Sequence, residues 1–131
     1  MTRGPLLLLA SALVLTACDE PCVADLDLSC TPLEADTSWS NVYEVVIQPS
    51  CAPAGVSCHA SEGLAGGLDL GDESGAYEAL GPHLTPGDAA CSDTVKRLYS
   101  DRSGFQMPPG SALSEPEACM IVLWIDAGAQ P

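Results

Sequence analysis

The first 17 residues limit what the rest of the chain can fold into, because they have the pattern of a cleaved export signal. Arg3 supplies a positive charge, and residues 6–15 are apolar apart from Ser11. That run is too short to span a bilayer as a helix, but it suits the core of a signal peptide. We therefore expect residues 1–17 to be removed. Residues 18–131 are enough chain for one domain with a modest core.

The apolar run ends in Leu15-Thr16-Ala17-Cys18, which resembles the lipobox of bacterial lipoproteins. Small residues let a peptidase approach the backbone, and the Cys18 thiol is the group that would take a diacylglyceryl chain. An ordinary signal peptide with a chance cysteine is the alternative. No second apolar run of membrane length follows, so we expect a lipid anchor alone. The expected location is the cell envelope, on the periplasmic or outer face of a membrane.

Acidic residues dominate the charge of the chain. It has 18 acidic and four basic residues, for a formal net charge of −14, and loss of Arg3 with the signal makes this −15. Only Lys96, Arg97 and Arg102 then remain as basic residues. Such a surface repels nucleic acid, so we expect no nucleic-acid partner. A solvated acidic surface is the simplest interpretation.

Six cysteines remain once Cys18 is set aside. An even number in an oxidising compartment predicts disulfides, or disulfides together with covalently modified cysteines. Short spans and positions beside expected helix starts suggest three candidate pairs, which are Cys22–Cys30, Cys51–Cys58 and Cys91–Cys119.

Residues 18–36 show little periodicity and are expected to form an acidic tether. From about residue 38 to residue 48, apolar side chains recur at helical spacing, at positions 39, 42, 43, 46 and 47. Three consecutive β-branched residues leave a strand as the alternative, but the spacing favours a helix. Thr37 or Ser38 is a suitable cap, and Pro49 is expected to end the helix.

Short helices and long loops are expected in the rest of the chain. One helix is expected over residues 75–80, with Ser74 as its cap, and another over residues 92–100, with Ser92 as its cap and Tyr99 facing inward. The last helix has the plainest signal, because Ser114 and Glu117 form a capping-box pattern. The sequence therefore predicts a small all-α domain over residues 37–131.

The residues with the most informative chemistry are Cys51, the adjacent pair Cys58-His59, and Met107 about fifty residues later. Gly-Gly-Leu follows at 66–68, Met-Pro-Pro-Gly lies at 107–110, and Trp-Ile-Asp-Ala-Gly-Ala lies at 124–129. In this order the motifs resemble those of c-type cytochromes, most of all the small exported, planctomycete-type cytochrome-c-like domains. The resemblance covers about residues 39–129.

This resemblance implies a covalently held haem c and electron transfer, with a redox partner protein that the sequence does not identify. The thiols of Cys58 and Cys51 would add to the haem vinyl groups, with Cys58 the surer of the two. His59 would be the proximal iron ligand and Met107 the distal one, and methionine ligation raises the reduction potential. No enzyme reaction is indicated.

The spacing of the two cysteines departs from the family pattern. The attachment motif is Cys-x-x-Cys-His, whereas here six residues separate Cys51 from Cys58. Three outcomes are compatible with this spacing: Cys51 reaches the second vinyl across a bulged loop, haem hangs from Cys58 alone, or the two cysteines form a disulfide. The last outcome gives the alternative function, a haem-free, disulfide-stapled envelope lipoprotein that acts in structure or partner binding.

Overall fold

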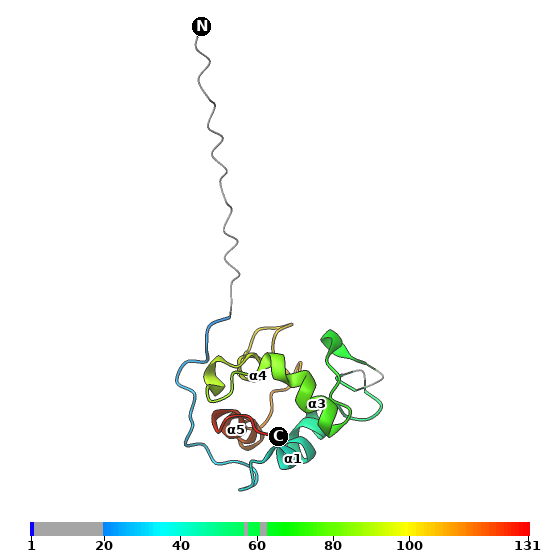
Figure 1. Cartoon of the computed structure of the whole chain (residues 1–131). Helices are drawn as coiled ribbons and strands as arrows, with labels where there is room; N and C mark the ends of the chain where they lie inside the picture. Colours follow the sequence, from blue (N-terminus) through cyan, green and yellow to red (C-terminus); the bar gives the residue numbers. More distant parts are fainter. Residues whose placement is uncertain (2–19, 57, 61–62) are drawn as a thin grey trace.

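The computed structural model describes residue 1 and residues 20–56, 58–60 and 63–131 (Figure 1). Residues 2–17 of the predicted signal peptide and the predicted lipidation site Cys18 lie outside these described residues. Helices connected by turns and loops form the described part, which contains no strand, so the all-α prediction is confirmed. None of its helices has the length and apolar character needed to cross a membrane.

In chain order the helical elements of the described residues are α1 (Trp39–Val42), η1 (Tyr43–Ile47), α2 (Gln48–Cys51), η2 (Ala65–Gly67), α3 (Glu73–Leu80), η3 (Gly81–His83), η4 (Ala89–Cys91), α4 (Asp93–Leu98) and α5 (Glu115–Asp126). Of these, η1 is a π-helix and η2, η3 and η4 are short 3₁₀ turns.

Elements α1, η1 and α2 follow one another without a break, so the predicted first helix exists but extends to Cys51. Pro49 does not end it, contrary to the prediction, and instead lies in the first turn of α2. A proline inside a helix lacks an N–H donor and clashes with the carbonyl four residues earlier. The wider π turn of η1 immediately precedes Pro49 and accommodates this misfit. The helix therefore carries Cys51 at its last position.

The hydrophobic core forms where α1 packs against α5. The indole rings of Trp39 and Trp124 lie 4.7 Å apart between centroids, and Tyr43 and Tyr77 complete an aromatic cluster. The Tyr77 hydroxyl donates to the carbonyl of Ala129, which holds the C-terminal residues against this cluster. Seven of the twelve residues of α5 are buried, all of them between Ala118 and Ile125, which explains the continuous apolar run in this part of the sequence.

The helix ends differ in detail from the predictions. The capping box of Ser114 and Glu117 is present at the start of α5. Asp72, rather than Ser74, caps α3, because its carboxylate accepts a hydrogen bond from the Gly75 N–H. Tyr99 follows the end of α4 and is 46% exposed, so its predicted inward position is wrong.

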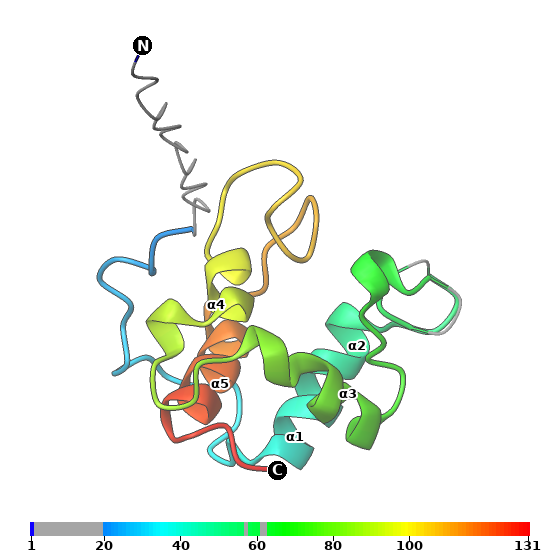
Figure 2. The ribbon, with the colours of Figure 1, turned by 45° about the horizontal axis from the view of Figure 1, so that its top comes forward.

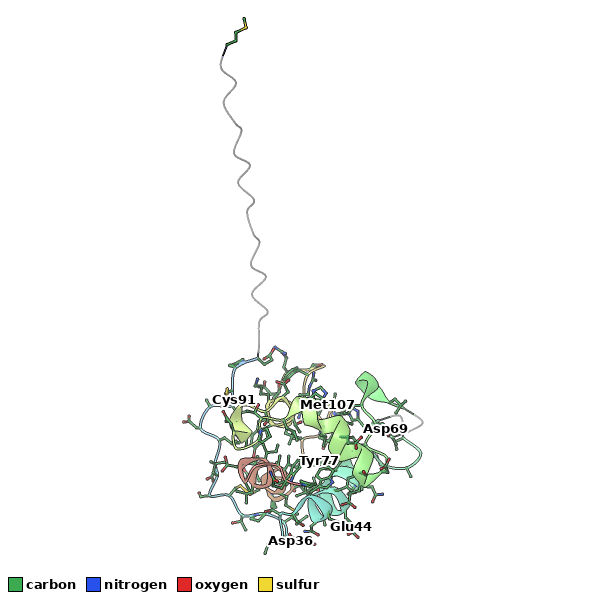
Figure 3. All side chains as sticks on the ribbon, viewed as in Figure 1. Asp36, Glu44, Asp69, Tyr77, Cys91 and Met107 are labelled. Carbon is green, nitrogen blue, oxygen red and sulfur yellow. A yellow bond between two sulfur atoms is a disulfide. The ribbon has the colours of Figure 1, made fainter. Side chains whose placement is uncertain are left out.

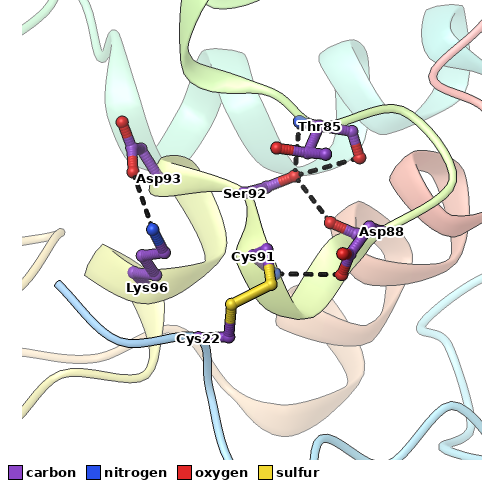
Figure 4. Close-up of a disulfide and its surroundings, with 7 residues drawn as sticks. All are labelled: Cys22, Thr85, Asp88, Cys91, Ser92, Asp93 and Lys96. Carbon is purple, nitrogen blue, oxygen red and sulfur yellow. Dashed lines mark hydrogen bonds and ion pairs between the residues drawn. A yellow bond between two sulfur atoms is a disulfide. The ribbon is translucent and has the colours of Figure 1, made fainter. Parts of the chain in front are cut away.

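Ser92 precedes α4 as predicted, but its hydroxyl does not cap that helix. It accepts a hydrogen bond from the Thr85 N–H at 2.8 Å and donates to the Asp88 carbonyl at 3.1 Å (Figure 4). Ser92 is fully buried, so these bonds satisfy a hydroxyl that water does not reach. The side chain therefore closes the turn before α4.

The disulfides are Cys22–Cys91 and Cys30–Cys119 (Figure 4 shows the first). The predicted pairs Cys22–Cys30 and Cys91–Cys119 are therefore wrong. Residues 20–36, which we call the strap, lie across the outside of the helices (Figure 2). Backbone bonds from Val23 to Ala90 and from Leu33 to Pro116 fasten it there. Because each strap cysteine meets a different helical element, neither pairs with its neighbour along the chain.

Candidate functional site

The loop that follows α2 brings Cys58 and His59 back beside Cys51. The His59 backbone N–H donates to the Cys51 carbonyl at 3.1 Å, which closes the intervening residues into a bulge. Gly55 lies in this bulge at φ +75°, a left-handed conformation that glycine adopts without steric cost. The six-residue spacer therefore forms a loop outside this hydrogen bond, and Cys51 and Cys58 lie on either side of the bond. We call Cys51, Cys58 and His59, joined in this way, the closure.

Backbone bonds on the far side hold His59 as well. Its carbonyl accepts from the Leu70 N–H at 2.6 Å, and the Leu70 carbonyl accepts from the Tyr43 hydroxyl at 3.1 Å. Leu70 is buried, and the Tyr43 side chain comes from the helix that also delivers Cys51. Gly66 and Gly67 lie in the turn of the chain between His59 and Leu70, with φ of +65° and +75°. The Tyr43 bond could not be predicted, because apolar periodicity does not identify the partner of a hydroxyl group.

The side chains at this closure have suitable chemistry for haem attachment. Cys51 and Cys58 are thiols and are not bonded to each other. Burial, reinforced by the charges of Cys58 and Glu117, raises the pKa of Cys51 to about 11. The Nδ1 atom of His59 is buried and has no hydrogen-bond partner among the described residues. The imidazole can supply a nitrogen to haem iron, as histidine does in many haem proteins.

Met107 lies on the second long loop, residues 101–113, which two arginines shape. The Met107 N–H donates to the Arg97 carbonyl at 3.0 Å, and the Arg97 guanidinium donates to the Phe105 carbonyl at 3.2 Å. The guanidinium carbons of Arg97 and Arg102 lie 4.4 and 4.6 Å from the centre of the Phe105 ring, within cation–π range. These roles of the two arginines were not predicted, although the basic residues after Arg3 are confined to positions 96–102 in the sequence.

The described contacts join Cys51, Cys58 and His59 to one another, but none joins Met107 to them. Figure 2 shows the segment between α2 and α3 and the yellow-to-orange segment between α4 and α5 as separate projections from the helices, and Figure 3 labels Met107. The distal ligand role of Met107 therefore stays a prediction. The donors present, two thiols and an imidazole at one closure and a thioether on a second loop, fit haem c by their chemistry.

An all-α domain with a helix that leads into a thiol, a Cys-His pair and a methionine loop has the features of a cytochrome-c-like domain. Comparison with protein families agrees: residues 56–111 match the family described as planctomycete cytochrome C. The matched region contains Cys58-His59 and Met107 but begins after Cys51. No curated protein and no solved structure gave a match. The chain contains a cytochrome-c-like domain, as the motifs predicted.

Proposed function

We propose that this chain is a lipid-anchored electron carrier of the cell envelope that binds haem c through the closure of Cys51, Cys58 and His59. The observation that carries the proposal is the hydrogen bond from the His59 N–H to the Cys51 carbonyl. It returns the second cysteine to the first despite six intervening residues. The family match supports haem binding and electron transfer in general, because the matched family is described as a cytochrome C.

In this proposal each thiol adds across one vinyl group, so that sulfur bonds to one vinyl carbon and hydrogen to the other. Cys58, which is adjacent to His59, and Cys51 would each hold the haem through a thioether. A His59 ring nitrogen and the Met107 sulfur would supply the iron ligands. When bound, the haem supplies a reversible one-electron couple, and methionine ligation raises its potential.

The attachment can be tested by making the protein in a host with haem-attachment machinery and mapping its peptides by mass. We expect a haem adduct on the peptide that contains Cys51, Cys58 and His59. The His59→Ala variant should lose the haem, whereas His83→Ala, at the other and exposed histidine, should retain it. If both variants retain as much haem as the wild type, His59 is not the iron ligand.

The bulge offers a second, sharper comparison. Deletion of residues 53–56 leaves Cys51-Ala52-Ser57-Cys58-His59, which is the ordinary attachment motif. We expect this shortened protein to carry haem on both cysteines at a yield equal to or above that of the wild type. Haem on the shortened protein but none on the wild type would show that the bulge prevents attachment.

A haem-free envelope lipoprotein is the second candidate function, and the two long-range disulfides favour it. They tie the strap to η4 and α5 without involving Cys51 or Cys58. Such a protein would act in envelope structure or partner binding. A non-reduced digest of protein from the native envelope separates the candidates, because a Cys51–Cys58 bridge supports this one and a haem adduct excludes it.

A further inference from the structure

The strap begins beside the loop that carries Met107. The Glu20 carboxylate and the Arg102 guanidinium form an ion pair at 2.5 Å, and two residues later the Cys22–Cys91 disulfide fixes the strap next to α4. In Figures 1 and 2 the start of the strap lies by the 101–113 loop, whereas α1 and the C-terminus lie on the opposite side of the domain. The chain therefore enters the domain at one defined face.

Very little chain separates this face from the expected lipid. Only Asp19 stands between Cys18 and Glu20, and an extended chain spans about 3.5 Å per residue. The backbone of Cys18 can thus lie at most about 7 Å from that of Glu20 and about 14 Å from that of Cys22. The disulfide prevents the strap from peeling away to lengthen this connection. Acyl chains on Cys18 would therefore hold the face where the chain enters the domain at the lipid headgroups.

The charge distribution fits the same orientation. Lys96, Arg97 and Arg102, all the basic residues after Arg3, lie on α4 and at the start of the next loop. Lys96 pairs with Asp93 and Arg102 pairs with Glu20, so this face is close to neutral. Most of the acidic residues that the structure describes lie elsewhere and form no ion pair there. Anionic headgroups would repel the acidic residues elsewhere on the domain, but they would repel this nearly neutral face much less.

We propose that the entry face, defined as Glu20, α4 and the 101–113 loop, lies against a phospholipid bilayer with anionic headgroups. The short lipid-bearing connection imposes this orientation, so α1 and the C-terminus face away from the membrane. The inference rests on the lipid anchor of the proposed function but not on its haem. One consequence is that the Met107 loop lies at the membrane surface, where a partner embedded in the bilayer can reach it.

The test uses the lipidated protein, residues 18–131, in vesicles of phosphatidylcholine and phosphatidylglycerol that contain a gadolinium-chelating lipid. A nitroxide is attached through a ketone-bearing residue, which spares the cysteines, at either Ser103 or Ser40. Both serines are exposed, Ser103 on the entry face and Ser40 on α1. Relaxation enhancement should be several-fold larger at position 103. Equal enhancement at both positions, or a larger one at position 40, would overturn the proposal.

A variant with a longer connection between Cys18 and Glu20 tests whether the short connection causes the orientation. A flexible Gly-Ser segment inserted between Asp19 and Glu20 should reduce the difference between the two positions to near zero. Persistence of the full difference would overturn the role assigned to the short connection. The mass of the N-terminal peptide reports the diacylglyceryl group, and its absence from Cys18 would overturn the anchor and this inference together. A missing haem spectrum would contradict haem binding alone and leave the orientation result unaffected.

Discussion

Two regions of the domain are closed by different means. The strap, η4, α4 and α5 are tied by two disulfides and by backbone bonds between the strap and the helices. In the described part of the loop from residue 52 to residue 71, the connections are hydrogen bonds, among them those of His59 with Cys51 and Leu70. Together with Cys51 at the end of α2, this loop provides two thiols and a buried imidazole nitrogen without a partner among the described residues.

The difference shows how six cysteines are divided between two tasks. Four of them lock a small domain whose core alone would give limited stability. The other two lie on either side of the bond that positions His59, in the part of the chain where the proposed function needs thiols for covalent attachment. In the proposed function, stability and attachment chemistry therefore belong to separate regions, and we expect that each can be altered without the other.

The largest effect is expected from removal of the Cys30–Cys119 disulfide as a pair of alanines. The bond closes a sequence separation of 89 residues, and loops of this length are stabilised by about 4–5 kcal/mol in the chain-entropy account. Denaturant unfolding of the haem-free protein should show a loss approaching that size. The matched control is Cys51→Ala with Cys58→Ala, which should change the unfolding free energy much less. Equal losses for the two double variants would contradict the division between the regions.

A smaller effect is expected for the reactivity of Cys51. Burial raises its pKa from 9.0 to about 11, so at pH 8 the thiolate fraction, and with it the alkylation rate, should be about 100-fold lower than in the unfolded chain. Because folding favours the protonated thiol, the associated stability is present below pH 9 and is lost as pH rises from 9 to 11. Alkylation of the haem-free protein, read by peptide mass, gives the titration. Native Cys51 that titrates near pH 9 would contradict its burial beside Cys58.

The smallest effect is expected for Ser92→Ala, in the turn before α4. The change removes the acceptor for the Thr85 N–H and the donor to the Asp88 carbonyl, and one such hydrogen bond contributes about 0.5–1.5 kcal/mol. Thermal unfolding should show a lowered midpoint. Ser40→Ala, at an exposed position of α1, is the matched control and should change stability by less than about 0.5 kcal/mol. If both variants unfold at the same midpoint, the hydrogen bonds around Ser92 do not contribute as argued.

Local patterns allowed much of the helical fold to be predicted. Apolar spacing identified the first helix, and the Ser114 and Glu117 pair identified the start of α5, because both signals depend only on neighbouring residues. The end of the first helix was mispredicted, since the π turn before Pro49 is set by the whole helix rather than by proline alone. The exposed Tyr99 shows the same limit at the end of α4.

The disulfide pairing could not be predicted from spacing. It depends on where the strap crosses the helices, and bonds such as Val23 to Ala90 decide that in three dimensions. At the candidate site, the Cys-His pair was recognisable as a motif, but the closure from His59 to Cys51 was not. That bond joins residues eight apart across an irregular bulge, for which no periodic signal exists.

The visible absorption spectrum of the wild-type protein, purified from a host with haem-attachment machinery, tests the central claim most directly. The proposed function predicts a Soret band that persists after denaturation and extraction with acidified organic solvent, because thioether bonds at Cys58 and Cys51 keep the haem on the chain. Protein that is folded, carries both strap disulfides and shows no Soret band would contradict haem binding.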